Sequence, residues 1–322
     1  AADKLGAESA GEVKLGYFAN VTHAQAVLGV ASGDFERAIA PATLTTRLFN
    51  AGPSLIEAMF AGEVDIAYVG PGPALAAFQK SKGQGIRVIA GAAGDGVVIV
   101  ARKGLGIASF DQLKGRKLAT PQHGNTQDIS ARHFLQQKFG SDAITNIVPI
   151  SNAEQVGMMR RGDIDAAWVP EPWGQMLISQ ADATLVAEEK DLWPDKRFSL
   201  TVVITTPAFL KAHPDVVQRM LAVHHDWTLK LQNGRQAYLQ ALEDALFKLQ
   251  GKRLPEGVLA TALDRVRFID APDAGSFEAF AAWSNALGFA RSSVSLTDLI
   301  DTTILDSVIT APSTQTTPAT QP

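Results

Sequence analysis

The chain has 322 residues, 46% of them hydrophobic, and 29 basic against 33 acidic residues give a net charge of −4. This length is sufficient for two packed lobes. The absence of cysteine excludes disulfides, thiol nucleophiles and thiolate metal sites. The charges are spread without a basic cluster, so we expect no nucleic-acid partner. No apolar run reaches the roughly 20 residues that span a bilayer, so we expect no membrane insertion.

The two ends of the sequence differ in composition from the rest. Ala1-Ala2-Asp3 is a small, polar start of the kind that remains after a signal peptidase has cut, which predicts an exported protein. The tail from Ala311 is rich in Thr, Pro and Gln and shows no apolar period. We therefore expect residues 1–11 and 311–322 to be flexible.

Strand-like runs alternate with helical runs through the first two thirds of the chain, which predicts an α/β fold. The predicted strands are Val13–Phe18, Asp65–Val69, Arg87–Ala92, Val97–Ala101, Lys117–Ala119, Asn146–Ile150, Asp163–Val169 and Leu200–Thr205. The predicted helices are Pro53–Ala61, Pro73–Lys82, Thr126–Phe139 and Ala153–Arg161. After Pro207 the apolar residues recur at helical spacing, and this helical part should pack on the lobes.

An internal repeat with a period of 100 residues supports two similar lobes. Residues 51–73 align without a gap with residues 151–173 and share Met59/Met159, Gly62/Gly162, Asp65/Asp165, Ala67/Ala167 and Val69/Val169. Each copy reads as a helix, a Gly that ends it, a strand and a Pro-containing loop. Because loops at the carboxyl ends of strands line the crevice of open α/β sheets, the repeat predicts a ligand cleft between two lobes.

Five sequence blocks resemble one family in order and separation: residues 16–24 (GYFANVTHA), 49–53 (FNAGP), 65–71 (DIAYVGP), 119–128 (ATPQHGNTQD) and 168–173 (WVPEPW). The chain is similar to the nitrate/sulfonate/taurine family of ABC-transporter binding proteins, in particular to its aliphatic-sulfonate branch. The resemblance covers Glu12 to about Ile309. It implies a type II periplasmic-binding-protein fold with two Rossmann-like lobes joined by two crossover strands.

The resemblance also implies boundaries and a role. Lobe one should comprise residues 12–101 and 206–309, and lobe two residues 102–205. We expect the crossings near Arg102–Gly106 and Leu200–Thr206. The implied protein is periplasmic and monomeric, has no cofactor, binds a small organic anion such as an alkanesulfonate or taurine, and delivers it to a membrane permease. Other ligands in the family, namely nitrate, a phosphonate or a pyrimidine, stay open at this point.

Candidate ligand contacts follow the ends of the predicted strands. Asn125 is a good N-cap behind Gly124, and the amides of Thr126 and Gln127 can point at an oxyanion. Gly70-Pro71-Gly72 repeats this arrangement in the first lobe, with a Gly amide that no side chain obstructs.

Further candidates are side chains. Asn20 can hydrogen-bond, and a charged His23 can pair with an anion; His123 precedes the second anion loop. Gly94-Asp95 departs from the small uncharged residues of the family, and Asp95 in the cleft would favour an amino group on the ligand. Glu171 and Trp173 lie on a loop restrained by two prolines, where Trp173 can wall an alkyl chain or hold a cation.

Enzyme and metal signatures are missing from the sequence. It contains no G-x-S-x-G, no G-x-x-x-x-G-K-[ST] and no H-E-x-x-H. His224-His225 is no metal pair, because adjacent helical residues point about 100° apart. We therefore expect no catalysis. An enzyme on the same fold remains the rival from another class, because His23, His123, Asp95 and Glu171 together could supply an acid–base site.

Overall fold

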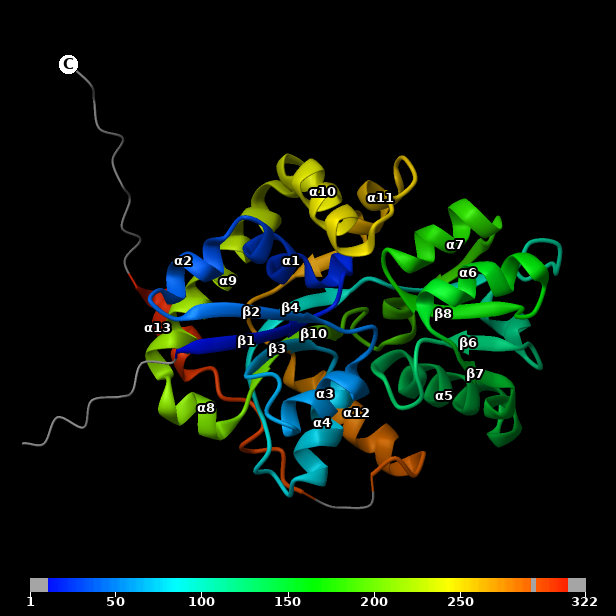
Figure 1. The fold of residues 1–322 in the computed structure, drawn as a ribbon. Helices are drawn as coiled ribbons and strands as arrows, with labels where there is room; N and C mark the ends of the chain where they lie inside the picture. The colour runs from blue at the N-terminus through cyan, green and yellow to red at the C-terminus, as the bar shows by residue number, and fades with distance from the viewer. Residues whose placement is uncertain (1–10, 291–293, 312–322) are drawn as a thin grey trace, which may run out of the picture.

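The computed structural model describes residues 11–290 and 294–311. Two α/β lobes lie side by side, each with its own sheet flanked by helices (Figure 1). Across these two ranges, no helix combines the length and apolarity that a bilayer crossing demands. The termini that the sequence predicts to be flexible lie almost entirely outside the described residues.

The lobe-one sheet has the strand order β11-β4-β10-β3-β1-β2. Its members are β1 (Glu12–Tyr17), β2 (Thr43–Leu48), β3 (Ile66–Val69), β4 (Arg87–Asp95), β10 (Ser199–Thr205) and β11 (Val266–Phe268). The helices that follow its strands are α1 (Ala24–Ala31), α2 (Asp34–Ile39), α3 (Gly52–Phe60) and α4 (Pro71–Lys80).

The lobe-two sheet has the order β7-β6-β8-β5-β9. It consists of β5 (Val97–Ala101), β6 (Leu118–Thr120), β7 (Ile147–Pro149), β8 (Ala166–Pro170) and β9 (Thr184–Glu188). Its helices are α5 (Thr126–Phe139), α6 (Asn152–Arg161) and α7 (Trp173–Ala181). The described residues thus form the two-lobed α/β architecture that the sequence predicts.

The 100-residue repeat corresponds to matching elements in the two sheets: α3 and β3 in lobe one, α6 and β8 in lobe two. The repeated Asp performs the same task in both. Asp65 Oδ2 accepts the Lys14 amide at 2.9 Å, and Asp165 Oδ2 accepts the Lys117 amide at 3.0 Å. Each carboxylate thus satisfies a donor at the start of the neighbouring strand, so the shared Asp has a structural role.

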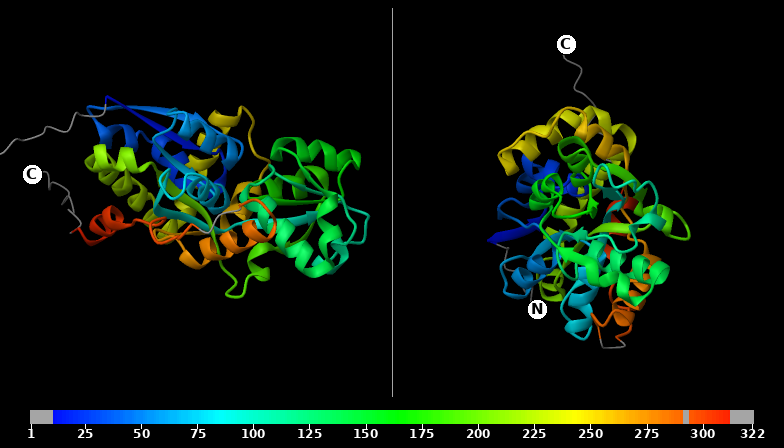
Figure 2. Two further views of the ribbon diagram at one scale, coloured as in Figure 1. Left: turned by 90° about the horizontal axis from the view of Figure 1, so that it is seen from below. Right: turned by 90° about the vertical axis from the view of Figure 1, so that its right-hand side faces the viewer.

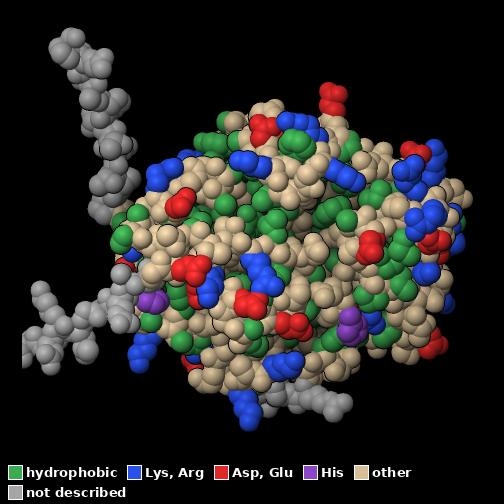
Figure 3. Space-filling view, viewed as in Figure 1, with side chains coloured by type: hydrophobic (Ala, Val, Ile, Leu, Met, Phe, Trp, Pro, Cys, Tyr) green, Lys and Arg blue, Asp and Glu red, His purple; other side chains and the backbone are tan. Residues whose placement is uncertain are grey.

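The helical C-terminal part packs on lobe one and reaches lobe two. Its helices are α8 (Pro207–Ala212), α9 (Pro214–Gly234), α10 (Leu239–Gln250), α11 (Val258–Asp264), α12 (Ala274–Ala286) and α13 (Thr303–Thr310). Helix α12 packs against both α4 and α5, and α11 packs against α7 (Figure 2). On the face drawn in Figure 3, acidic and basic side chains are interspersed, and neither sign gathers into one field.

The crossings between lobes differ from the predicted positions. Strand β5 pairs with β8 and β9 of lobe two, although the expected boundary placed it in lobe one. Strand β10 pairs with β3 and β4 of lobe one, although it was assigned to lobe two. The chain changes sheets at Gly96 and again just before Ser199. Strand β5 is apolar throughout and β10 carries an apolar run at its centre, and such a pattern identifies a strand but not its partner.

Candidate functional site

The N-terminus of α5 is the best-defined donor group between the lobes. Asn125 has extended backbone angles, and its Oδ1 accepts the Asp128 amide at 2.8 Å, so it is the N-cap that the sequence predicts. The first residues of an α-helix have no intrahelical acceptor for their amides. Within the described chain the Thr126 and Gln127 amides have no acceptor at all. Two N–H groups and the positive end of a 14-residue helix are therefore available to an anion.

Asp128 holds this loop in place, and the prediction overlooked it. Its carboxylate is fully buried and accepts from the Thr120 hydroxyl at 2.7 Å, the Gly124 amide at 2.9 Å and Arg132 Nε at 2.9 Å. Gly124 has φ +76°, which glycine adopts without strain. An acidic residue three positions after an Asn cap resembles a capping box, which is the signal that could have identified it.

Lobe one contributes side chains from the end of β1. Asn20, Thr22 and His23 are buried around the short 3₁₀ turn Val21–His23. The Thr22 hydroxyl and the Asn20 Nδ2 group have no hydrogen-bond partner among the described residues, and both side chains line the space between the lobes. They are therefore free to bind a ligand.

His23 is a neutral donor and not the cation that the sequence suggested. Burial lowers the pKa of His23 from 6.5 to about 3. Its Nδ1 accepts the Phe18 amide at 3.3 Å, so the hydrogen of the neutral ring is on Nε2. The ring stacks on Phe18 with centroids 4.3 Å apart, which fixes its plane. At neutral pH it offers an N–H without a positive charge.

The start of α4 approaches lobe two very closely. A Cβ at Gly70 would lie 2.1 Å from Thr126 Oγ1, and a Cβ at Gly72 would lie 3.0 Å from the Ile129 side chain. The Gly72 amide, which was expected to face the ligand, donates to Thr126 Oγ1 at 3.2 Å. Pro71 and Pro73 have no amide hydrogen. This helix start therefore serves contact between the lobes, and of its predicted residues only Gly70 lines the cavity.

A cavity of about 30 Å³ lies between the lobes at this point. It is lined by Phe18, Asn20, Thr22, His23, Gly52, Gly70, Pro73, Asn125, Thr126, Gln127, Pro170, Leu200 and Thr201. Six of these were predicted: Asn20, His23, Gly70, Asn125, Thr126 and Gln127. The set contains no Lys, Arg, Asp or Glu. The cavity is therefore a compact space with neutral donors.

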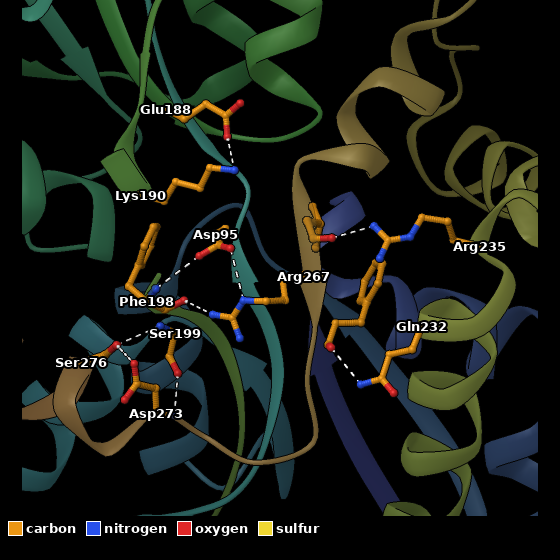
Figure 4. Close-up of polar contacts among 12 residues, drawn as sticks. Asp95, Glu188, Lys190, Phe198, Ser199, Gln232, Arg235, Arg267, Asp273 and Ser276 are labelled. Carbon is orange, nitrogen blue, oxygen red and sulfur yellow. Dashed lines mark hydrogen bonds and ion pairs between the residues drawn. The ribbon is translucent and has the colours of Figure 1, made fainter. Parts of the chain in front are cut away.

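Asp95 and Gly94 lie at the lobe crossing, and neither lines this cavity. Figure 4 shows Asp95 between Arg267 and Phe198. The Asp95 carboxylate binds Arg267 Nε at 3.2 Å and accepts the Phe198 amide at 3.3 Å. Gly94 is surrounded by the Arg267 guanidinium and the Phe198 carbonyl, and a Cβ there would clash with both. The sequence offered no sign of this, because Arg267 lies far along the chain. Asp95, at the end of β4, therefore joins this strand to the start of β10 and to β11.

Glu171 is also engaged in a contact between lobes. It is fully buried, and its carboxylate forms an ion pair with Arg265 at the end of α11 and accepts the Gln175 amide at 3.0 Å. Burial raises the pKa of Glu171, and Arg265 opposes that shift. Arg265 Nε also lies 3.8 Å from Glu188 of β9. Glu171 therefore fastens lobe two to the C-terminal helices, away from the cavity.

Neither His123 nor Trp173, both predicted ligand contacts, lines the cavity. The His123 side chain is 65% exposed, lies 3.5 Å from Asp128 and contacts Phe289, so it faces outward. Trp173 Nε1 donates to Asn20 Oδ1 at 3.0 Å, from α7 to the end of β1. Trp173 therefore forms a wall just outside the cavity.

Some lining residues were not predicted. Leu200 and Thr201 come from β10, whose assignment to the wrong lobe hid them. Thr201 is a buried residue that lines the cavity, so its hydroxyl is a further candidate for ligand contact. No group of three His, Asp or Glu residues that could hold a metal ion occurs in the described ranges.

Comparison with known proteins gives family and fold. Curated relatives match 179 residues, and the match spans about half the length of both chains; the taurine-binding periplasmic protein of Escherichia coli strain K12 is 26% identical over 55% of this chain and 54% of its own. The alkanesulfonate-binding protein SsuA from Xanthomonas axonopodis pv. citri bound to MOPS aligns with a TM-score of 0.76 at 19% identity, over 91% of this chain and 99% of that chain.

A DSZB mutant in complex with biphenyl-2-sulfinic acid aligns with a TM-score of 0.64 at 14% identity, over 92% of this chain and 98% of that chain. At these identities the solved structures establish the two-lobed fold of periplasmic binding proteins and nothing about the ligand. The NMT1-like family model matches residues 6–242. The family and fold expected from the sequence are thereby confirmed, and the chain belongs to the NMT1-like family.

Proposed function

We propose that this protein is the periplasmic substrate-binding protein of an ABC importer, and that it closes over a small monoanionic sulfonate and presents it to a membrane permease. The observation that supports the ligand is the α5 N-terminus: two free amides face a cavity whose other donors are neutral. A binding protein of this kind is exported and acts as a monomer.

The charge of the lining residues favours one class of anion. A monoanion such as a sulfonate is matched by helix-terminal amides together with the His23 Nε2–H and the Thr22 and Thr201 hydroxyls. A dianionic phosphonate would require an Arg or Lys, and none lines the cavity. Taurine carries an ammonium group, and burying it without a carboxylate beside it costs free energy. Since Asp95 and Glu171 are bound to Arg267 and Arg265, an alkanesulfonate is favoured over taurine.

Nitrate is the second candidate, and the size of the cavity supports it. A cavity of about 30 Å³ accommodates a planar four-atom anion without any alkyl chain. Nitrate is also monoanionic, so the neutral donors suit it as well.

An enzyme reading has less support from the lining residues. General acid–base catalysis needs a group whose pKa lies near the working pH. The titratable side chain among the described lining residues is His23, and burial lowers its pKa to about 3. His123, Asp95 and Glu171 are directed to other partners.

The experiment is isothermal titration calorimetry with methanesulfonate, butane-1-sulfonate, taurine, nitrate, sulfate, methylphosphonate and a pyrimidine, followed by recovery of the ligand. We expect the alkanesulfonates to bind at least tenfold more tightly than taurine and to be recovered unchanged. Tight binding of nitrate alone would replace the sulfonate by the second candidate. Tight binding of taurine or the phosphonate would contradict the charge argument, and conversion of any ligand would contradict the transport role.

A further inference from the structure

A second, larger cavity adjoins the first. Its volume is about 550 Å³ against about 30 Å³ for the inner cavity. We call it the outer chamber; residues at the end of β2, the start of α6, α7 and the turn after α10 line it. Helices α7 and α10, which carry or adjoin its lining residues, lie along the upper edge of the lobe boundary in Figure 1. Both lobes contribute walls, so the outer chamber forms only when they are close together.

One hydrogen bond separates the two spaces. Asn20 lines both the inner cavity and the outer chamber, whereas Trp173 lines the outer chamber alone. Their contact joins Trp173 Nε1 to Asn20 Oδ1 at 3.0 Å, between lobe two and lobe one. The indole is only partly buried. The contact between Asn20 and Trp173 is therefore the boundary between the two spaces.

The outer chamber has an apolar wall. Leu48, Phe49, Val156, Met176 and Leu254 line it. Leu48 is 40% exposed, although it ends a strand of the sheet. Large apolar side chains left open inside a concave space indicate an apolar partner.

The charges of the outer chamber exclude a cationic partner. No Asp or Glu lines it, whereas Lys252 and Arg253 do. The Asn152 residue is only 7% exposed, and its Oδ1 has no hydrogen-bond partner among the described residues. That oxygen has almost no accessible surface, so it offers a ligand in the chamber no contact.

We propose that the outer chamber is a second subsite of the same ligand, and that the transported sulfonate carries an uncharged apolar arm which passes between Asn20 and Trp173 and is buried there. This inference rests on the proposed function, because it assigns the head group to the inner cavity. An inner cavity of about 30 Å³ holds little more than that head group. Any longer chain must leave it, and the outer chamber lies directly beyond Trp173.

The test is a calorimetric series at pH 7 with methanesulfonate, butane-1-sulfonate, pentane-1-sulfonate, benzenesulfonate and 4-aminobutane-1-sulfonate. Each methylene buried in an apolar chamber tightens binding about fourfold. Pentane-1-sulfonate has four more methylenes than methanesulfonate, so it should bind up to about 250-fold more tightly. Its isostere 4-aminobutane-1-sulfonate should bind at least tenfold more weakly than pentane-1-sulfonate, because its ammonium finds no carboxylate.

Gly157→Phe fills the outer chamber. Gly157 lies in α6, and a Cβ there meets only the flexible end of Arg161 at 3.3 Å, so a side chain is accommodated. The affinity ratio of pentane-1-sulfonate to methanesulfonate should fall from about 250-fold to below fivefold. Arg160→Leu, at an exposed position of the same helix, is the matched control and should preserve the ratio. Met176→Ala is a milder second variant, which should lower the ratio severalfold.

The outcomes separate the two proposals. An equal affinity for all chain lengths, or a ratio that Gly157→Phe and Met176→Ala leave unchanged, would overturn the second subsite while the sulfonate function stands. Equal affinity for the amino isostere would overturn the uncharged arm. If no sulfonate binds, the proposed function fails, and the second subsite fails with it.

Discussion

The two lobes share a scaffold but recognise a ligand by different means. Lobe two offers backbone amides at the start of α5, behind an Asn cap. Lobe one, at the corresponding edge, offers the side chains of Asn20, Thr22 and His23, while its α4 start has prolines and an amide already bound to Thr126. The repeat thus includes helices α3 and α6, strands β3 and β8, and the Asp that joins each of these strands to the neighbouring strand. The groups that can donate to a ligand are not part of the repeat and differ between the lobes.

The two lobes also differ in the group that hydrogen-bonds to a buried aromatic side chain. Tyr68 and Trp168 occupy matching positions of the repeat, and both are fully buried. The Tyr68 hydroxyl lies 2.8 Å from His224 Nδ1, whereas Trp168 Nε1 donates to Glu189 at 2.7 Å. One lobe satisfies its aromatic group with a base and the other with an acid. Their stabilities should therefore respond to pH in opposite directions.

The link between the lobes gives the largest expected effect. Arg265→Met leaves the fully buried Glu171 carboxylate without its cation, which should lower the free energy of unfolding by about 3 kcal/mol. Urea unfolding at pH 7, followed by circular dichroism, measures this change. Arg161→Met, which breaks the exposed pair with Asp163, is the control and should cost under about 0.5 kcal/mol. Similar losses in both variants would show that the buried pair has no special role.

The pH response of lobe two comes next. Burial, opposed by hydrogen bonds from Trp168 and Trp193, raises the pKa of Glu189 from 4.5 to about 7. The folded state therefore binds the proton more tightly, and this stabilisation is present below pH 4.5 and is lost as pH rises through 7. The loss amounts to up to roughly 3 kcal/mol. Glu189→Gln should abolish this decline in urea midpoints between pH 5 and 8; an unchanged slope would refute the assignment.

The pH response of lobe one has the opposite sign. Burial lowers the pKa of His224 from 6.5 to about 4. The unfolded state then binds more protons between these values, so stability is lost as pH falls from 6.5 towards 4. Gln can accept from Tyr68 and donate to the Gly91 carbonyl, as the neutral ring does. His224→Gln should therefore flatten the loss between pH 6.5 and 5; a steeper loss would contradict the neutral histidine.

The two recognition modes can be tested at the α5 amides. Thr126→Pro removes one amide at the first helical position, where proline is tolerated, and Asn125 has the extended angles that a residue before proline needs. We expect sulfonate affinity to fall about a hundredfold, since a charge-assisted bond is lost. Thr126→Val keeps the amide and loses the hydroxyl, so it should cost less than tenfold. If the variant lost as much stability, measured by its melting temperature, as it lost affinity, the loop would have a structural role only.

The smallest effect concerns the repeated glycines. Gly62 and Gly162 have φ +74° and +82°, and a Cβ at either meets no atom closer than 3.6 Å. Alanine at either position should cost about 1 kcal/mol, from backbone strain alone. The two variants should have urea midpoints equal within error. Unequal costs would mean that the helix ends of the two lobes are not equivalent.

Much of this arrangement was predictable because it is local. The repeat identified α3, β3, α6 and β8, and the Asn cap identified the α5 amides. The partners of Asp95 and Glu171 were not predictable, because Arg267 and Arg265 lie 172 and 94 residues away and no pattern links them. The predicted lobes of β5 and β10 were wrong for the same reason. His23 was misjudged because its charge depends on burial, which the neighbouring residues do not encode.

Gly70 has a consequence for how often the protein is closed. A methyl group there would lie 2.1 Å from Thr126 Oγ1, so even alanine would act as a wedge between the lobes. Such a wedge would leave the donors intact and reduce only the fraction of molecules able to close, and the apparent affinity would fall by that fraction. The absence of a side chain at Gly70 therefore helps to set the equilibrium between open and closed molecules.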